Sequence, residues 1–141
     1  MINIMLDTNI LITGLAFNGN ERKLLNAIYL NKANLILNEF VIIETKTILS
    51  KKFPILEKVF DDFLQLIQAK ITPLPELEMV KNAKTIIRDP KDAVVLASAI
   101  LFNPDVFVSG DLDFHTTTVK SFINVMHTRE AIALVRYHRQ S

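Results

Sequence analysis

Five acidic side chains in this chain of 141 residues stand beside apolar segments that should be buried. They are Asp7, Glu44, Asp92, Asp111 and Asp113. A carboxylate at the edge of a hydrophobic core is unfavourable unless a positive group meets it. Two carboxylates about 4 Å apart repel by roughly 4 kcal/mol at an effective dielectric constant of about 20, and further acids add to this repulsion. If the five converge, we expect a divalent cation between them.

The chain contains no cysteine, so oxygen atoms, with histidine as a possible addition, are the metal ligands that it offers. An oxygen-rich site suits Mg²⁺ or Mn²⁺, because these ions bridge carboxylates to phosphate oxygens. A metal ion bound in this way lowers the pKa of a bound water and neutralises charge on a phosphodiester. These residue types therefore predict metal-dependent hydrolysis of phosphodiester bonds.

Each acid also has a structural explanation of its own. Asp7 could form a turn or cap the segment that follows it, residues 10–15. Asp92 would be the third residue of a helix capped by Asp89, where an acid can form part of a capping box and complement the helix dipole. The other three could be surface or loop acids. A single metal site accounts for all five, whereas the structural explanations would have to hold separately.

Short apolar runs alternate with helical patterns along the chain. We expect strands at residues 2–6, 35–37, 106–108 and 123–126, and a short apolar run that ends at residue 71. We expect helices at residues 21–31, 39–52, 54–67, 76–87 and 90–102, and a closing helix capped by Thr128. Apolar strands that alternate with helices are typical of a parallel sheet covered on both faces. The predicted fold class is an α/β sandwich.

In such a sheet, ligands bind beyond the carboxyl ends of the strands, where the strand order reverses. Asp7 directly follows the first strand, and Asp111 follows the strand 106–108 through a Ser-Gly turn. Glu44 and Asp92 stand near the starts of helices, and a helix that follows a strand starts where that strand ends. We therefore expect these four acids at one rim of the sheet.

The composition is that of a globular protein. Half of the residues are hydrophobic and 22% are charged, so we expect a well-filled core and a single domain covering residues 1–141. The net charge of +1 excludes neither nucleic acid nor acidic ligands. No apolar run approaches the roughly 20 residues that cross a bilayer. The apolar N-terminal segment lacks a basic leader and a small-residue cleavage site, so we expect a cytoplasmic protein without a membrane partner.

Other site chemistries do not match these residues. A glycine-rich nucleotide-binding loop is missing, since the only glycines are Gly14, Gly19 and Gly110. A haloacid-dehalogenase phosphatase needs a second aspartate two residues after its nucleophile, where this chain has Asn9. A response-regulator receiver needs an acidic pair after the first strand and a lysine after a late strand, and neither is present.

Four segments resemble, in order, the successive signatures of PIN domains. They are residues 5–11, 41–44, 89–99 and 109–114, with the sequences MLDTNIL, VIIE, DPKDAVVLASA and SGDLDF. The resemblance implies a three-layer sandwich around a five-stranded parallel sheet of order 3-2-1-4-5. It also implies a Mg²⁺- or Mn²⁺-dependent ribonuclease that acts on single-stranded RNA.

The resemblance carries over to individual residues of this chain. The acidic quartet of the family is matched by Asp7, Glu44, Asp92 and Asp111, and the frequent fifth acid by Asp113. The polar pair that supports the first aspartate is matched by Thr8 and Asn9. Because the quartet is complete, we expect a nuclease. The alternative is a PIN-fold RNA-binding or protein-interaction module without significant nuclease activity.

Stand-alone PIN domains of this size are similar to VapC-type toxins of prokaryotic toxin–antitoxin pairs, which implies a homodimer and a small antitoxin partner. Family dimers pack helices that include the region matching residues 54–68, where this chain has a wide apolar face. Core packing explains that face equally well.

RNA binding requires cations at the rim of the acidic pocket. Lys46, Lys91 and Arg22 are candidate phosphate contacts, although solvated helix faces explain such residues too. His115 follows the acidic turn and could touch a phosphate or be a surface histidine. His127 carries no readable signal.

Overall fold

Five parallel strands form the centre of the structure, a computed structural model that describes residues 1–137. In chain order they are β1 (Asn3–Leu6), β2 (Asn34–Asn38), β3 (Lys70–Thr72), β4 (Val106–Val108) and β5 (Val125–Met126). Their order in the sheet is β3-β2-β1-β4-β5, so the predicted parallel sheet and its strand order are confirmed.

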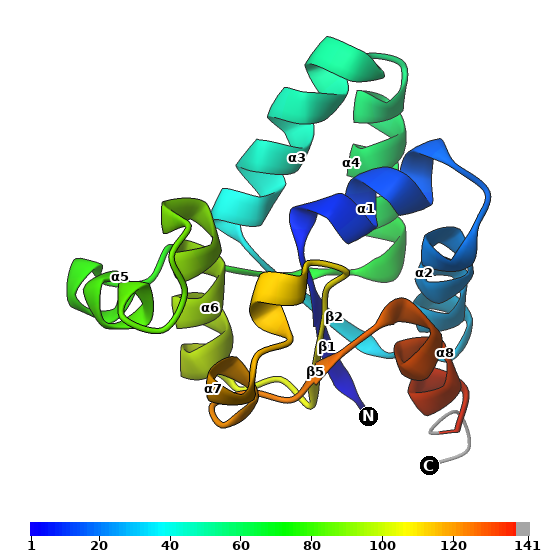
Figure 1. Ribbon diagram of the computed structural model, residues 1–141. Helices are drawn as coiled ribbons and strands as arrows, with labels where there is room; N and C mark the ends of the chain where they lie inside the picture. Colours follow the sequence, from blue (N-terminus) through cyan, green and yellow to red (C-terminus); the bar gives the residue numbers. More distant parts are fainter. Residues whose placement is uncertain (138–141) are drawn as a thin grey trace.

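Helices cover both faces of this sheet, and the predicted three-layer α/β sandwich is confirmed (Figure 1). The α-helices are α1 (Thr8–Ala16), α2 (Asn20–Leu30), α3 (Glu39–Lys52), α4 (Leu56–Ile67), α5 (Leu77–Lys84), α6 (Pro90–Phe102), α7 (Thr117–Lys120) and α8 (Thr128–Tyr137). A 3₁₀ helix, η1 (Leu112–Phe114), follows β4. In Figure 1, α5 packs on α6 at the left of the sheet, α2 packs on α8 at the right, and α3 and α4 project above it.

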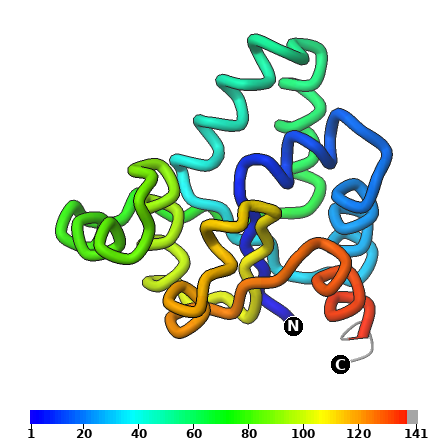
Figure 2. The backbone as a smooth tube through the Cα atoms, viewed as in Figure 1, coloured from blue at the N-terminus to red at the C-terminus, as the bar shows by residue number. Residues whose placement is uncertain are grey.

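The chain reverses direction across the sheet between β1 and β4. After β1 it proceeds outward through β2 to β3, and it then returns through α5 and α6 to place β4 on the other side of β1 (Figure 2). Leu6 at the end of β1 lies opposite Val108 at the end of β4. The carboxyl ends of β1 and β4 therefore form the switch point at which parallel sheets bind ligands.

Side-chain caps fix the starts of α3 and α6, the two helices that carry acids of the site. The Asn38 side chain, fully buried at the end of β2, accepts a hydrogen bond from the Val41 N–H (2.8 Å) and caps α3, as predicted. Asp89 caps α6 by accepting from the Lys91 N–H (2.8 Å), and Pro90 occupies the first helical position, also as predicted. These caps set where α3 and α6 begin relative to the strand ends.

Some local predictions differ from the structure. Pro54 lies two residues before α4 instead of in its first turn. Thr128 is the first residue of α8 and not its cap, and the His127 N–H before it donates to the side chain of Glu130 in the first turn (Oε1, 3.1 Å). The short helices η1 and α7 were not predicted, because three or four residues are too few to show helical periodicity. Within residues 1–137, no helix is long and apolar enough to cross a membrane.

Candidate metal centre

Asp7 occupies the switch point between β1 and β4. Its backbone N–H donates to the carbonyl of Val108 (3.3 Å), and its buried carboxylate faces the end of the sheet. Oδ1 accepts from the Ile10 N–H (3.0 Å) and caps α1, while Oδ2 accepts a short hydrogen bond from the Ser109 hydroxyl. Asp7 is thus a helix cap, as its structural explanation predicted, and also lies where a ligand site is expected.

Ser109 joins two of the predicted site residues. Its buried hydroxyl donates to Asp7 and accepts from the Asp111 N–H (3.0 Å). In the sequence, Ser109 indicated only a turn, and this contact was not predicted. The signal that could have found it is the pairing of β4 with β1, because Ser109 directly follows β4 and, once the strands are paired, lies beside Asp7, which follows β1.

A cluster of three carboxylates lies next to this pair. Asp111 accepts from the Asp113 N–H (2.9 Å) and starts η1, and Asp92 reaches the same place from the first turn of α6. One carboxylate oxygen from each of the three lies within 4.8 Å of the other two. Among the described residues, the Asp92 carboxylate accepts no hydrogen bond, so the capping box proposed as its alternative role does not form.

Burial, and then repulsion from neighbouring acids, make Asp92 and Asp7 hard to ionise. Burial, and then the charges of Asp89, Asp111, Asp113 and Asp7, raise the pKa of Asp92 to about 7. The pKa of Asp7 is also raised, mainly because that carboxyl is buried. Its hydrogen bonds with Ser109 and Ile10 oppose this shift, and the charges of Asp111 and Glu44 add to it. Asp89, which the sequence analysis treated only as a cap, therefore contributes charge to the site.

Glu44 approaches the other acids from the first half of α3. Its side chain is 21% exposed, and Lys91 Nζ lies 3.7 Å from Glu44 Oε2. Lys91 is mostly exposed and stands one residue before Asp92 on α6. The ion pair places one positive charge at the rim of the acidic site.

The four acids of the predicted quartet line one pocket, with a volume of about 210 Å³. The residues around it are Asp7, Thr8, Asn9, Glu44, Ile48, Asp89, Lys91, Asp92, Val95, Asp111 and Phe114. Asp113 does not line this pocket, although its carboxylate belongs to the three-acid cluster. Residues up to about a hundred positions apart in sequence are thus brought together, as predicted.

The supporting residues divide into two groups. Thr8 and Asn9 line the pocket, and the buried Thr8 hydroxyl has no hydrogen-bond partner within residues 1–137.

Two of the three predicted phosphate contacts bind other parts of the protein, away from the pocket. Arg22 donates to the Gly14 and Leu15 carbonyls at the end of α1 (3.1 and 2.9 Å), and Lys46 pairs with Asp61 on α4 (3.0 Å). Of the three candidate cations, Lys91 alone lines the pocket.

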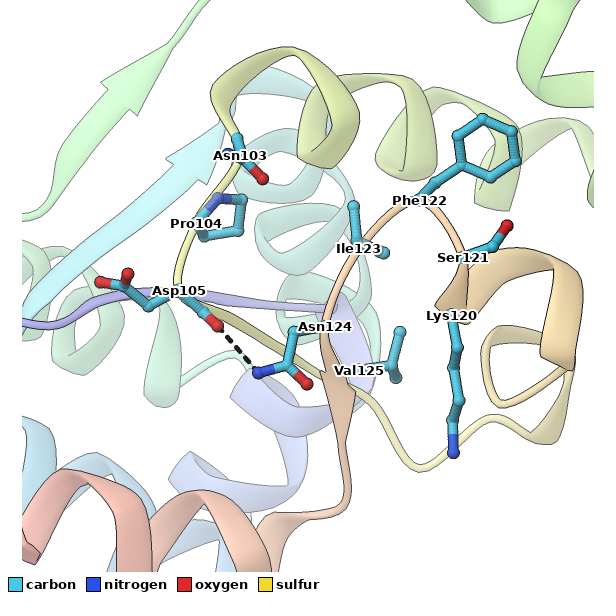
Figure 3. A pocket seen from close by; sticks show the side chains of 9 residues that line it. All are labelled: Asn103, Pro104, Asp105, Lys120, Ser121, Phe122, Ile123, Asn124 and Val125. Atoms are coloured by element: carbon cyan, nitrogen blue, oxygen red, sulfur yellow. Dashed lines mark hydrogen bonds between the residues drawn. The ribbon is translucent and has the colours of Figure 1, made fainter.

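Another hollow, of about 510 Å³, lies at the opposite end of the strands, where α6 leads into the start of β4 and α7 leads into the start of β5 (Figure 3). Its charged lining residues are Asp105 and Lys120, and the Asn124 amide donates to the Asp105 carbonyl (3.0 Å). It is larger than the acidic pocket but contains a single carboxylate. The density of acids, and not the volume, therefore identifies the candidate site.

The residues at the acidic pocket fit a hard divalent cation. Oxygens bound to one Mg²⁺ at about 2.1 Å are at most about 4.2 Å apart, so the cluster of Asp92, Asp111 and Asp113 needs side-chain adjustments of less than about 1 Å. All donors are oxygens, and two of the acids have raised pKa values. Burial and repulsion both raise these pKa values, and a cation held here would oppose both by stabilising the charged carboxylates.

The fold and the site together define the class of this protein. It is an all-parallel α/β sandwich that carries a cluster of carboxylates at its switch point. The sequence matches the PIN domain over residues 3–113, and the chain belongs to the PIN-domain family. The family resemblance drawn from the four short segments is confirmed. Among curated proteins, none matches the chain.

Solved structures of low sequence identity share the fold. One is a chain of FitAcB from Neisseria gonorrhoeae, with a TM-score of 0.67 and 17% identity, covering 89% of this chain and 98% of that one. Another is a chain of VapBC2 from Rickettsia felis bound to a DNA fragment from their promoter (TM-score 0.65, 16% identity, 89% and 98% covered). A third is a chain of FitAB bound to the IR36 DNA fragment (TM-score 0.66, 17% identity, 89% and 94% covered).

Proposed function

We propose that this PIN-domain protein is a Mg²⁺- or Mn²⁺-dependent endoribonuclease that hydrolyses phosphodiester bonds of single-stranded RNA. The observation that carries the proposal is the convergence of Asp7, Glu44, Asp92 and Asp111 on one pocket, beside the three-carboxylate cluster. These four acids come from separate elements and meet at the switch point of a PIN fold, and two of them, Asp7 and Asp92, have raised pKa values that no shared structural role explains. A metal-dependent hydrolase gives them one.

In this proposal, Asp92, Asp111 and Asp113 hold the metal together with Asp7 and Glu44. The ion, when bound, supplies Lewis-acid activation of water and neutralises charge on the phosphodiester. The acids themselves position the cation and accept protons. The Ser109 hydroxyl orients Asp7 and the Asp111 backbone at the same time, so two of the ligands keep a fixed relative position.

Lys91 is the residue that we propose to contact the RNA phosphate. Its ammonium group pairs with Glu44 at 3.7 Å, and it is exposed enough to turn toward a phosphate. A point charge at the rim offsets repulsion between the acids and the RNA backbone. Thr8 and Asn9 support Asp7 from the start of α1 in this proposal, and the exposed Asn9 side chain lines the pocket.

The test is cleavage of a labelled single-stranded RNA by the purified protein at pH 8 with Mn²⁺. We expect cleavage that EDTA abolishes and that falls by more than about 100-fold in Asp7→Asn, because one ligand loses its charge. Lys120→Ala, at the hollow on the opposite end of the sheet, is the matched control and should retain activity. If wild-type protein cleaves no faster than Asp7→Asn, the enzyme proposal fails and a PIN-fold binding module is the better description.

We also propose that the protein is the toxin of a toxin–antitoxin pair with a small protein antitoxin. The support is its likeness in fold to chains from VapBC2 and FitAB assemblies. Expression of the chain should arrest bacterial growth, and co-expression of a small protein from the neighbouring reading frame should restore it. Normal growth under expression of an active nuclease would count against the toxin role.

A homodimer through α4 is a further part of the proposal. Ile55, which directly precedes α4, and Val59 and Leu66 on the helix lie on one stripe and are 86%, 43% and 62% exposed, although Phe60 on the same helix is fully buried. Core packing therefore does not account for the whole apolar face. Sedimentation should give a dimer for the wild type and a monomer for Leu66→Lys, and a monomeric wild type would contradict this.

We propose finally that residues 1–141 form a single domain. The support is one continuous hydrophobic core, which extends from Ile2, just before β1, to Val135 on α8. Limited proteolysis should then yield no stable smaller fragment.

A further inference from the structure

Two histidines that the proposed mechanism does not use lie face to face behind the acidic turn. The rings of His115 and His127 have centroids 3.8 Å apart and planes inclined by 2°. His115 directly follows η1 and is half-buried, whereas His127 is exposed and precedes α8. The stack therefore joins the segment that carries Asp111 and Asp113 to the segment between β5 and α8.

His115 also holds the backbone of Ser109. Its Nε2 lies 2.7 Å from the Ser109 carbonyl oxygen. A carbonyl oxygen only accepts, so Nε2 must carry the hydrogen and donate it. Nδ1 of the same ring is buried without a partner within residues 1–137, so this ring has a single hydrogen bond that fixes its orientation.

The segment around His127 binds the backbone N–H of Ser109. The Ser109 N–H donates to the Met126 carbonyl (3.2 Å), and the His127 N–H is fixed by Glu130 at the start of α8 (3.1 Å). Ser109 thus has its N–H bound to residue 126 and its carbonyl bound to a ring stacked on residue 127. Both peptide groups of this residue are held by one structural unit.

We infer that His115 and His127 are positioning residues for the metal site. They fix the Ser109 backbone, and Ser109 in turn presents the hydroxyl that joins Asp7 to Asp111. The inference rests on the proposed function, because it assigns the stack a role in setting the relative position of two metal ligands. Groups that orient metal ligands from behind typically contribute 10–100-fold to metal affinity.

Four variants separate the hydrogen bond from the stack. His115→Phe keeps a flat ring but loses the N–H donor, whereas His115→Gln keeps an N–H donor but loses the ring. His127→Phe keeps a ring to stack on His115, and His127→Ala removes it. Phe17→Ala is the matched control, since it removes a ring from the Phe17–Phe53 edge contact at the far end of α1.

The first measurement is the Mn²⁺ dissociation constant at pH 8 by calorimetry, without RNA, on variants that unfold cooperatively. We expect about 10-fold weaker binding or more in His115→Phe, a smaller loss in His115→Gln, and weaker binding in His127→Ala that His127→Phe restores. Phe17→Ala should bind as the wild type does.

The second measurement is hydrogen exchange of the Asp111 amide in metal-free protein. This amide donates to the Ser109 hydroxyl, so it should exchange faster in His115→Phe and His127→Ala. Wild-type Mn²⁺ affinity and wild-type exchange in these two variants would overturn the inference. Failure of the wild type itself to bind Mn²⁺ would instead reject the proposed function, and the Asp111 exchange would still report whether the stack holds the turn.

Discussion

Asp92→Asn should abolish metal-dependent RNA cleavage while making the metal-free protein more stable at pH 8. Both effects follow from the position of this carboxylate. It faces Asp111 and Asp113 without accepting a hydrogen bond from any described residue, and its pKa is raised to about 7. The amide of asparagine removes the charge that repels the neighbouring acids and also removes the strongest kind of ligand for Mg²⁺ or Mn²⁺.

The sign of the stability change depends on pH. A carboxyl whose pKa is raised in the folded state resists ionisation there, so its unfavourable contribution is complete above pH 7. It is relieved as the pH falls from about 7 toward the ordinary value of 3.8. Asp92 is partly exposed, and solvent screening keeps the gain in unfolding free energy well below that of the full shift, at about 1–2 kcal/mol at pH 8.

Urea unfolding of both proteins in EDTA at pH 8 and at pH 5 measures this difference. The advantage of Asp92→Asn should shrink as the pH is lowered. Glu78→Gln, at an exposed position on α5, is the control and should change stability by less than about 0.5 kcal/mol. A destabilised Asp92→Asn protein at pH 8 would mean that the carboxylate has a structural role that the geometry does not show.

Mn²⁺ should raise the melting temperature strongly at pH 8 and hardly at pH 5. A ligand that binds only the folded state at 100 times its dissociation constant stabilises by about 2.7 kcal/mol, which corresponds to roughly 6–10 °C for a chain of this size. Below about pH 7 the metal must displace a proton from Asp92, and the raised pKa of Asp7 acts in the same direction. Its apparent affinity therefore falls as the pH is lowered.

Thermal unfolding with and without Mn²⁺ at several pH values measures this dependence. The shift should be lost in Asp92→Asn and retained in Lys120→Ala. An equal shift at pH 5 and pH 8 would indicate that the ion binds outside the acidic pocket.

Much of the site could be predicted because strand ends and helix starts are visible in the sequence. Asp7 and Asp111 follow apolar strands directly, and the caps Asn38 and Asp89 locate the helices that carry Glu44 and Asp92. These signals are local. Parallel pairing then brings the strand ends together without further information.

The missed contacts depend on pairing between distant segments. The Asp7–Ser109 hydrogen bond joins residues 102 positions apart and requires the register of β1 on β4, which no local pattern specifies. The stack of His115 on His127 likewise depends on how η1 meets the start of α8. Local patterns also could not show that Arg22 would bind the last carbonyl groups of α1.

Both oxygens of Asp7 are already bound within the protein, one to the start of α1 and the other to Ser109 after β4. During synthesis, this carboxylate therefore reaches its final environment only after β4 has emerged and paired with β1. A chain interrupted before that point carries Asp7, Glu44 and Asp92 but lacks the hydroxyl and the two acids that complete the cluster. We therefore expect an incomplete translation product to lack the proposed nuclease activity until the strand β4 and the turn after it have been made.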